Sequence, residues 1–228
     1  MNTLAIVIAC GKEEEISSGT ETAFLTLGNE PMLALTLKTM QATPSIDGII
    51  VAVGKSRADA AVHLIKRYGC TKVRGIVIGG VTRLSTLRTV FSKMPEPAAV
   101  IVIHEASRPF VQIDVLEETI KAGKRYGCAI AAHRLPDAVK LAPKGMKATK
   151  TLERNCVWVA QTPQVFKADV LEKLIEGSAK DIKILDDESE FVRKPSEVHM
   201  VEAGPANIKI RTTADLAMAT ALLNANIA

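Results

Sequence analysis

The chain opens with an unbroken apolar segment that stops at a glycine. Residues 4–10 read LAIVIAC, and Gly11 follows them directly. An apolar run of strand length without polar alternation is typical of a strand buried on both faces of a parallel sheet. Because ligands of such sheets bind beyond the carboxyl ends of the strands, we expect a ligand beside Gly11. The next residues are Lys12 and then three glutamates. The negative charge of the glutamates is the wrong one for binding a phosphate.

The same strand signal recurs along the chain, and segments with helical spacing of apolar residues lie between its copies. We expect strands at residues 48–54, 73–78, 98–103, 128–132 and 197–202, and helices beginning near Pro31, Ser56, Thr82, Asp169 and Thr212, with another through Leu116 and Ile120 and a short one at 186–189. This alternation predicts an α/β fold, a three-layer sandwich around a mostly parallel sheet.

The alternation of strand and helix breaks between His133 and Trp158. A polar turn at 143–145 is flanked there by the extended stretches 134–140 and 151–154. This pattern predicts an extended β-arm at about residues 134–157, not a crossover helix. An arm that leaves its domain packs most simply on a second copy of the chain across a two-fold axis. We therefore expect a single domain over residues 1–228 that forms a homodimer through the arm.

Composition and charge exclude several classes of function. There are 29 Lys and Arg against 25 Asp and Glu, and no segment mixes basic with aromatic residues as a nucleic-acid surface does. No apolar run reaches the roughly 18 residues of a membrane span, and no signal-peptide pattern is present, so we expect a cytoplasmic protein without a membrane partner. The cysteines occur singly and are expected to be small buried hydrophobic residues: Cys10, Cys70, Cys128 and Cys156.

Four polar clusters follow predicted strands, at residues 11–15, 79–86, 104–109 and 207–209. Each alone has an ordinary explanation as a turn, a surface ion pair or a solvated lysine. Together they converge on one edge of the sheet, where this architecture binds phosphorylated ligands. The four histidines lack the paired spacing of a metal site, and no serine nucleophile elbow is present.

Five short motifs occur in order along nearly the whole chain. They are GGVTR at 79–83, HEASRP at 104–109, ERNCVWVAQTPQ at 153–164, DD at 186–187 and NIK at 207–209. In sequence and spacing they resemble GGxxR, HDAARP, DRNxxWxxxTPQ, T-D-[DE] and DNIK of the 2-C-methyl-D-erythritol 4-phosphate cytidylyltransferases. The resemblance implies a Rossmann-like sheet of the nucleotide-diphospho-sugar transferase type.

The resemblance also implies an activity in isoprenoid biosynthesis. CTP and a polyol phosphate would react to give a CDP-alcohol and pyrophosphate, with Mg²⁺ bridging the phosphates. The enzyme would be a homodimer whose arms reach into the neighbouring site. CTP and the polyol phosphate are thus the implied partners, and Mg²⁺ bound with CTP is the implied cofactor.

Site residues follow from the motif positions. Arg154 and Lys209 match the catalytic cations that position the incoming phosphate, with Arg154 supplied by the partner's arm. Glu105 stands at the family's metal-binding aspartate. The nucleotide-binding positions are Ala9, Cys10, Gly11, Gly79, Gly80, Arg83, Thr86, Glu105 and Ala106, and the substrate-binding positions are Arg108, Asp137, Arg154, Thr162 and Lys209.

The N-terminal loop departs from the family pattern. The family reads PAAGxGxRM followed by PKQ, and its arginine and lysine stabilise the pentavalent phosphorus. Here Glu14 stands at that arginine and Thr22 at that lysine, while Ala206 replaces the aspartate of DNIK. The change predicts a slow enzyme or an inactive one.

Three interpretations follow from this departure. The first is an impaired cytidylyltransferase, acting on 2-C-methyl-D-erythritol 4-phosphate or a related polyol phosphate such as ribitol 5-phosphate. The second is a catalytically inactive homologue that serves as a binding or regulatory protein. In the third, the glutamates of the loop bind an extra divalent ion.

Overall fold

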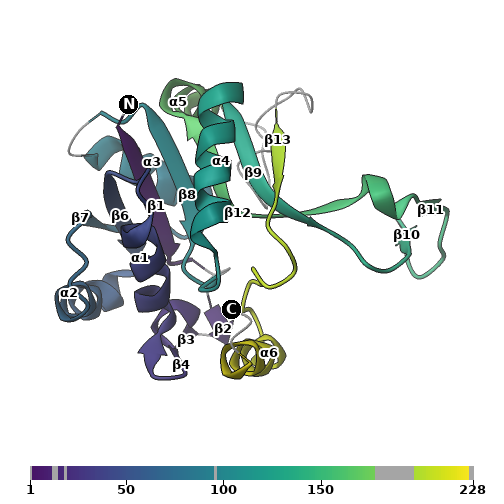
Figure 1. Ribbon diagram of the computed structural model, residues 1–228, viewed down its shortest axis with the longest axis horizontal. Coiled ribbons are helices and arrows are strands. Elements are labelled where there is room, and N and C mark those ends of the chain that lie inside the picture. The colour runs from purple at the N-terminus through teal and green to yellow at the C-terminus, as the bar shows by residue number, and fades with distance from the viewer. Residues whose placement is uncertain (1, 12–14, 18–19, 95–96, 178–197, 226–228) are drawn as a thin grey trace.

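The apolar run at the start of the chain forms the centre of a seven-stranded sheet. The computed structural model describes residues 2–11, 15–17, 20–94, 97–177 and 198–225. All seven residues of β1 (Thr3–Ala9) are buried. The strand order is β13-β9-β12-β8-β1-β6-β7 (Figure 1). The other strands are β6 (Gly48–Val53), β7 (Val73–Ile78), β8 (Val100–Glu105), β9 (Cys128–Arg134), β12 (Trp158–Lys167) and β13 (His199–Glu202).

The sheet is mostly parallel, as the sequence predicts. β1 pairs in parallel with β6 and β8, β6 with β7, and β9 with β13. β12 runs antiparallel to β8 and β9. β12 is not among the strands expected from the sequence, and it contains a proline, which is unusual in a strand paired on both sides. The structure accommodates Pro163 where the pairing register of β12 with β9 shifts, between Ala160 and Gln164.

Helices cover both faces of the sheet and make the three layers (Figure 1). One face packs on α1 (Met32–Ala42), α2 (Ala58–Arg67) and α4 (Ile113–Tyr126), and the other on α3 (Arg83–Lys93) and α5 (Ala168–Gly177). Alternate residues of β1 serve the two cores: Ala5 and Val7 lie in the first, and Ile6 and Ile8 in the second. Both faces of β1 are therefore covered, which explains its lack of polar alternation.

The C-terminal helix α6 (Thr213–Asn224) begins with the expected capping box. The Thr212 hydroxyl accepts from the Asp215 backbone N–H at 3.1 Å, and the Asp215 carboxylate accepts from the Thr212 N–H at 2.8 Å. α6 packs on a small third core.

The remaining short elements are β2 (Glu15–Ser17), β3 (Thr20–Glu21), η2 (Thr22–Phe24), β4 (Thr26–Leu27), β5 (Glu30–Pro31) and η3 (Lys55–Arg57).

An arm leaves the sheet at the end of β9 and returns at the start of β12. It contains β10 (Val139–Leu141), its antiparallel partner β11 (Lys150–Leu152) and η4 (Arg154–Cys156). The hairpin lies well away from the sheet (Figure 1). The predicted arm is present, and its role in dimerisation stays a prediction.

The structure tests two expectations drawn from composition, the burial of the cysteines and the absence of a membrane span. Cys10, Cys70 and Cys128 are buried, but Cys156 is exposed. The expectation that Cys156 is buried is wrong, because η4 belongs to the arm and not to the core. Among the helices that the structure describes, none is both long and apolar enough to cross a membrane.

Candidate functional site

One buried carboxylate binds three cationic side chains at the carboxyl edge of the sheet. Glu105 Oε1 accepts from Arg83 Nη1 at 2.6 Å and from Lys209 Nζ at 2.7 Å, and Glu105 Oε2 accepts from Arg108 Nε at 2.7 Å. Glu105 is 4% exposed, and the cationic side chains are 6–14% exposed. We call these four side chains the Glu105 cluster.

Three separate segments bring the Glu105 cluster together. Glu105 ends β8, Arg83 begins α3 after the β7 strand end, and Arg108 lies in the turn that follows β8. Lys209 comes from the segment between β13 and α6, which is fixed to the same turn by the hydrogen bond from the Ile210 N–H to the Ser107 carbonyl oxygen at 2.9 Å. The segments meet because β1, β7 and β8 all end at one edge of the sheet.

The ion pairs decide the charge of Glu105. Burial alone would raise the pKa of this carboxyl, but Arg83, Lys209 and Arg108 outweigh burial and hold the pKa well below its usual range. Glu105 is therefore ionised at neutral pH. The cluster combines one negative and three positive groups, a composition suited to binding a phosphate oxygen.

A chain of buried hydrogen bonds connects the Glu105 backbone, through Thr162 and His104, to the Arg108 backbone. The Glu105 N–H donates to Thr162 Oγ1 at 3.1 Å, and Thr162 Oγ1 lies 3.0 Å from His104 Nδ1. His104 Nε2 lies 3.1 Å from the Arg108 carbonyl oxygen. Burial lowers the pKa of His104 to about 4, although its hydrogen bond to the Arg108 carbonyl acts in the opposite direction. The imidazole is thus neutral at pH 7.

Asn207 joins the cluster to the antiparallel strand β12. Its backbone carbonyl accepts from Arg108 Nη1 at 2.9 Å. Its side-chain Nδ2 donates to Gln161 Oε1 at 3.0 Å and to the Thr162 carbonyl oxygen at 2.9 Å. Gln161 Nε2 in turn lies 3.0 Å from His133 Nδ1, next to the base of the arm. A continuous set of polar contacts therefore runs from the arm base to the cluster.

The predicted nucleotide loops pack against each other without room for larger side chains. A Cβ on Gly79 would lie 2.1 Å from Cys10 Sγ, and one on Gly80 would lie 2.1 Å from Ser85 Oγ. Thr86 Oγ1 accepts from the Gly80 N–H at 3.0 Å. Gly11, with φ +97°, occupies a backbone region that favours glycine. Gly79 thus permits the close approach of the β1 and β7 strand ends, and Gly80 permits close packing on Ser85 of α3.

The structure brings together some predicted residues and not others. Arg83, Glu105, Arg108, Thr162 and Lys209 form one connected group, and Cys10, Gly79, Gly80 and Thr86 form a second. Ala9 and Ala106 are fully buried at the ends of β1 and β8. Asp137 and Arg154 are exposed on the arm, where Arg154 Nη1 donates to the Pro136 carbonyl oxygen at 3.0 Å.

Sequence reasoning missed the roles of His104 and Asn207. His104 was weighed as a metal ligand, and both residues belonged to a polar cluster and a motif, but neither was given a role of its own in the site. The available signal was a histidine at the end of the apolar strand 100–105, where a buried polar ring needs partners on both nitrogens.

The acidic loop falls largely outside the described residues. Lys12, Glu13 and Glu14 lie there, as do Asp186 and Asp187 of the fourth motif. Thr22 is described: it is fully buried in η2, and its hydroxyl has no hydrogen-bond partner among the described residues. Its neighbour Glu21 forms an ion pair with Arg57, with Glu21 Oε2 2.5 Å from Arg57 Nε.

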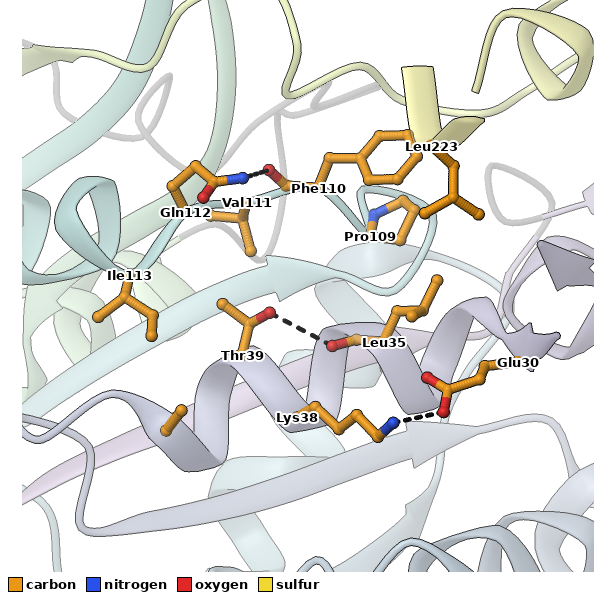
Figure 2. Close-up of a pocket in the computed structure, with 11 residues that line it drawn as sticks. Glu30, Leu35, Lys38, Thr39, Pro109, Phe110, Val111, Gln112, Ile113 and Leu223 are labelled. Carbon is orange, nitrogen blue, oxygen red and sulfur yellow. Dashed lines mark hydrogen bonds and ion pairs between the residues drawn. The ribbon is translucent and has the colours of Figure 1, made fainter. Parts of the chain in front are cut away.

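A separate cavity of about 490 Å³ lies between α1 and the segment 109–113. Its polar groups bond to one another, with Lys38 paired to Glu30 and the Thr39 hydroxyl donating to the Leu35 carbonyl oxygen (Figure 2). No predicted site residue lines this cavity. The candidate site is therefore the Glu105 cluster with the adjoining glycine loops.

The described side chains do not assemble a metal site of their own. Within the described ranges, no group of three or more His, Cys, Asp or Glu side chains is placed to hold a metal ion. Both oxygens of Glu105 are engaged by cations, so a divalent ion would have to displace at least one of them. Metal binding by Glu105 stays a prediction.

The chain matches a family model over residues 3–225, and that family is "IspD: 2-C-methyl-D-erythritol 4-phosphate cytidylyltransferase". The chain belongs to the IspD family. It is 34% identical over 221 residues to a 2-C-methyl-D-erythritol 4-phosphate cytidylyltransferase of Dehalococcoides mccartyi, covering 96% of this chain and 95% of that one. A relative with the same name in Geobacillus thermodenitrificans is 31% identical, with all of both chains covered.

The IspD family also includes longer proteins. The chain is 33% identical to a "Bifunctional enzyme IspD/IspF" of Desulforudis audaxviator, of which it spans 57%. Among solved structures, 4-diphosphocytidyl-2C-methyl-D-erythritol synthase from Anaerococcus prevotii superposes with a TM-score of 0.87 at 26% identity, covering 98% of this chain and 96% of that chain. The predicted family and fold are confirmed.

The buried, neutral His104 predicts an acid-sensitive fold. A histidine whose pKa is lower in the folded state than in the unfolded state makes folding less favourable as pH falls from about 6.5 to about 4. The full loss from His104 is about 3 kcal/mol. Glu105 affects stability at lower pH. The stabilisation that comes with its depressed pKa is lost as the pH falls below the pKa of the unfolded state, about 4.5.

Urea unfolding at pH 7.5 and pH 5 measures this effect. His104→Asn should reduce the stability difference between the two pH values by about 2 kcal/mol relative to the natural chain. His63→Asn, at an exposed position on α2, is the matched control and should leave the difference unchanged. The account of His104 is wrong if the two variants show the same pH dependence.

Proposed function

We propose that the chain transfers CMP from CTP to a polyol phosphate, giving a CDP-alcohol and pyrophosphate. The observation that carries this proposal is the convergence of Arg83, Arg108 and Lys209 on one carboxylate at the sheet edge. The glycine loops after β1 and β7 lie at the same edge, where this architecture binds its ligands. Family membership supports 2-C-methyl-D-erythritol 4-phosphate as the first substrate to test.

In this reaction a phosphate oxygen of the polyol phosphate bonds to the α-phosphorus of CTP. The bond from that phosphorus to the bridging oxygen of the β-phosphate breaks, and pyrophosphate leaves. Lys209 and Arg108 would hold the attacking phosphate, and Thr162 would orient it. Proteins accelerate such transfers mainly by positioning the groups and neutralising charge, which is what this set of cations offers.

Glu105 keeps the three cations in place when no substrate phosphate is bound. Its negative charge offsets part of their mutual repulsion, so that they remain clustered and largely buried. Mg²⁺ bound with CTP would neutralise phosphate charge, and Glu105 is the described residue that would hold it; a single protein ligand would suffice because Mg²⁺ usually keeps several waters. The nucleotide contacts would come from the glycine loops and Thr86.

We propose that the homodimer completes the site. Arg154 lies on an exposed arm that extends away from its own sheet, and its guanidinium donates to the Pro136 carbonyl oxygen at the base of the arm. An arm of this shape can reach the Glu105 cluster of a second copy across a two-fold axis. Arg154 and Asp137 would then act on the partner's substrate.

We further propose that Glu14 and Thr22 slow this enzyme. Two unit charges about 4 Å apart interact by about 4 kcal/mol at an effective dielectric near 20. Replacing an attractive cation by a carboxylate beside the triphosphate therefore costs several kcal/mol of transition-state stabilisation, and each 1.36 kcal/mol is about tenfold in rate. A second candidate function, a catalytically inactive binding or regulatory homologue, is favoured by the same acidic loop.

A pyrophosphate-release assay tests the proposed reaction. The natural chain should release pyrophosphate from CTP with 2-C-methyl-D-erythritol 4-phosphate, or with ribitol 5-phosphate in the same panel. Lys209→Met should lower kcat/KM by roughly 100-fold or more, because it removes a buried cation aimed at the phosphate. Absence of release with every polyol phosphate would leave the inactive homologue as the surviving proposal.

Mixed dimers test whether Arg154 acts across the interface. Arg154→Met and Lys209→Met should each be nearly inactive alone. If the site is shared, an equal mixture of the two unfolded and refolded together should recover about a quarter of the natural activity, since half of the dimers then carry one intact site of two. A mixture no more active than its components contradicts a shared site.

Restoring the cations of the loop tests the cause of slow turnover. Glu14→Arg combined with Thr22→Lys should raise the rate of pyrophosphate release by roughly tenfold or more. Glu14→Arg alone is included because Thr22 is fully buried, so a lysine there has to displace packed neighbours. No gain in either variant means that the loop does not limit the rate.

A further inference from the structure

The contacts of His104 fix its protonation and its role in the hydrogen-bond chain. Its ring is fully buried. The Arg108 carbonyl oxygen, 3.1 Å from Nε2, can only accept, so Nε2 carries the proton. In a neutral ring Nδ1 is then an acceptor, and the Thr162 hydroxyl, 3.0 Å away, donates to it. The same hydroxyl oxygen accepts from the Glu105 N–H at 3.1 Å.

We propose that His104 is a positioning residue of the phosphate site, a neutral imidazole protonated on Nε2 that holds the Thr162 hydroxyl with one nitrogen and the Arg108 backbone with the other. His104 itself is too deeply buried to touch substrate. Its two partners, Thr162 and Arg108, are residues that the proposed function assigns to binding of the polyol phosphate. The proposal rests on the proposed function only for the substrate used in the assay.

Each end of the imidazole fixes a different part of the site. Through Nδ1 the ring sets the direction in which the Thr162 hydroxyl points, because a hydroxyl that donates to Nδ1 and accepts from the Glu105 N–H has one orientation left. Through Nε2 it holds the turn after β8, so that Arg108 Nε reaches Glu105 Oε2 at 2.7 Å. Buried neighbours of this kind orient the groups that contact a ligand.

A histidine that merely fills space would be replaceable by residues of similar volume. The environment here is more specific, because Asn207 also binds both partners: it accepts from Arg108 Nη1 and donates to the Thr162 carbonyl oxygen. Arg108 and Thr162 are thus tied together twice, once by His104 and once by Asn207. This doubled connection indicates that the relative placement of the two residues matters.

Two amide substitutions test the contributions of the two ring nitrogens separately. In His104→Asn the amide oxygen lies near the position of Nδ1 and can accept from Thr162, but the bond to the Arg108 carbonyl is lost. In His104→Gln the amide nitrogen lies near the position of Nε2 and can donate to Arg108, but the bond to Thr162 is lost. Thr162→Val removes the hydroxyl with little change of shape, and Thr162→Ser restores it.

Steady-state kinetics of these variants tests the proposal. His104→Gln should raise the KM for the polyol phosphate by roughly tenfold with little change in the KM for CTP, since it loses the buried hydrogen bond to Thr162. Thr162→Val loses that bond and the one from the Glu105 N–H, so its KM should rise at least as much. Combining the two should cost no more than Thr162→Val alone, whereas adding Thr162→Val to His104→Asn should cost its full effect. Thr162→Ser, which keeps the hydroxyl, should recover most of the loss seen in Thr162→Val. Equal losses for both substrates, or additive effects in the first pair, overturn the positioning role.

A measurement without turnover keeps this test separate from that of the proposed function. At pH 7, ¹⁵N NMR of the full chain should show the His104 imidazole neutral and protonated on Nε2, and His104→Gln should weaken binding of inorganic phosphate in calorimetry by several-fold. An imidazole protonated on Nδ1 overturns the proposal even if the chain is active. If the chain releases no pyrophosphate but both results hold, the proposed function fails and the positioning role stands.

Discussion

The site depends on one electrostatic arrangement, in which the ionised Glu105 holds Arg83, Arg108 and Lys209 together at the end of β8. Without that carboxylate, three largely buried cations would repel one another and would lack compensation for their lost hydration. With it, they remain clustered at the edge of the sheet where we propose that substrate phosphate binds. The cluster is thus both a structural element and the basis of the proposed phosphate site.

The fold supplies this arrangement by bringing strand ends to one edge. β1, buried on both faces, fixes the centre of the sheet, and the turns after β7 and β8 carry Arg83, Glu105 and Arg108 to the same place. The antiparallel strand β12 adds Thr162 from beneath, at the point where its register with β9 shifts. Because the arm enters the sheet at the same strands, the site and the proposed dimer contact share a common base.

The sequence predicted the elements that follow from local pattern. Apolar runs and glycines located the parallel strands and the site edge, because burial on both faces removes polar alternation. β12 was not predicted, because its place in the sheet depends on pairing with β8 and β9. Cys156 was expected to be buried because single cysteines usually are, although it lies in the predicted arm, where the structure shows it exposed. The partners of His104 come from residues far apart in the chain, so no local pattern could assign its role.

The central claim is that the Glu105 cluster recognises a phosphate group. Calorimetric titration of the natural chain, in the presence of CTP, with 2-C-methyl-D-erythritol 4-phosphate and separately with the unphosphorylated polyol tests it most directly. The account predicts that the phosphate ester binds, that its affinity falls as salt is added, and that the free polyol binds at least tenfold more weakly, a difference of about 1.4 kcal/mol. Equal affinity for the two compounds would contradict it.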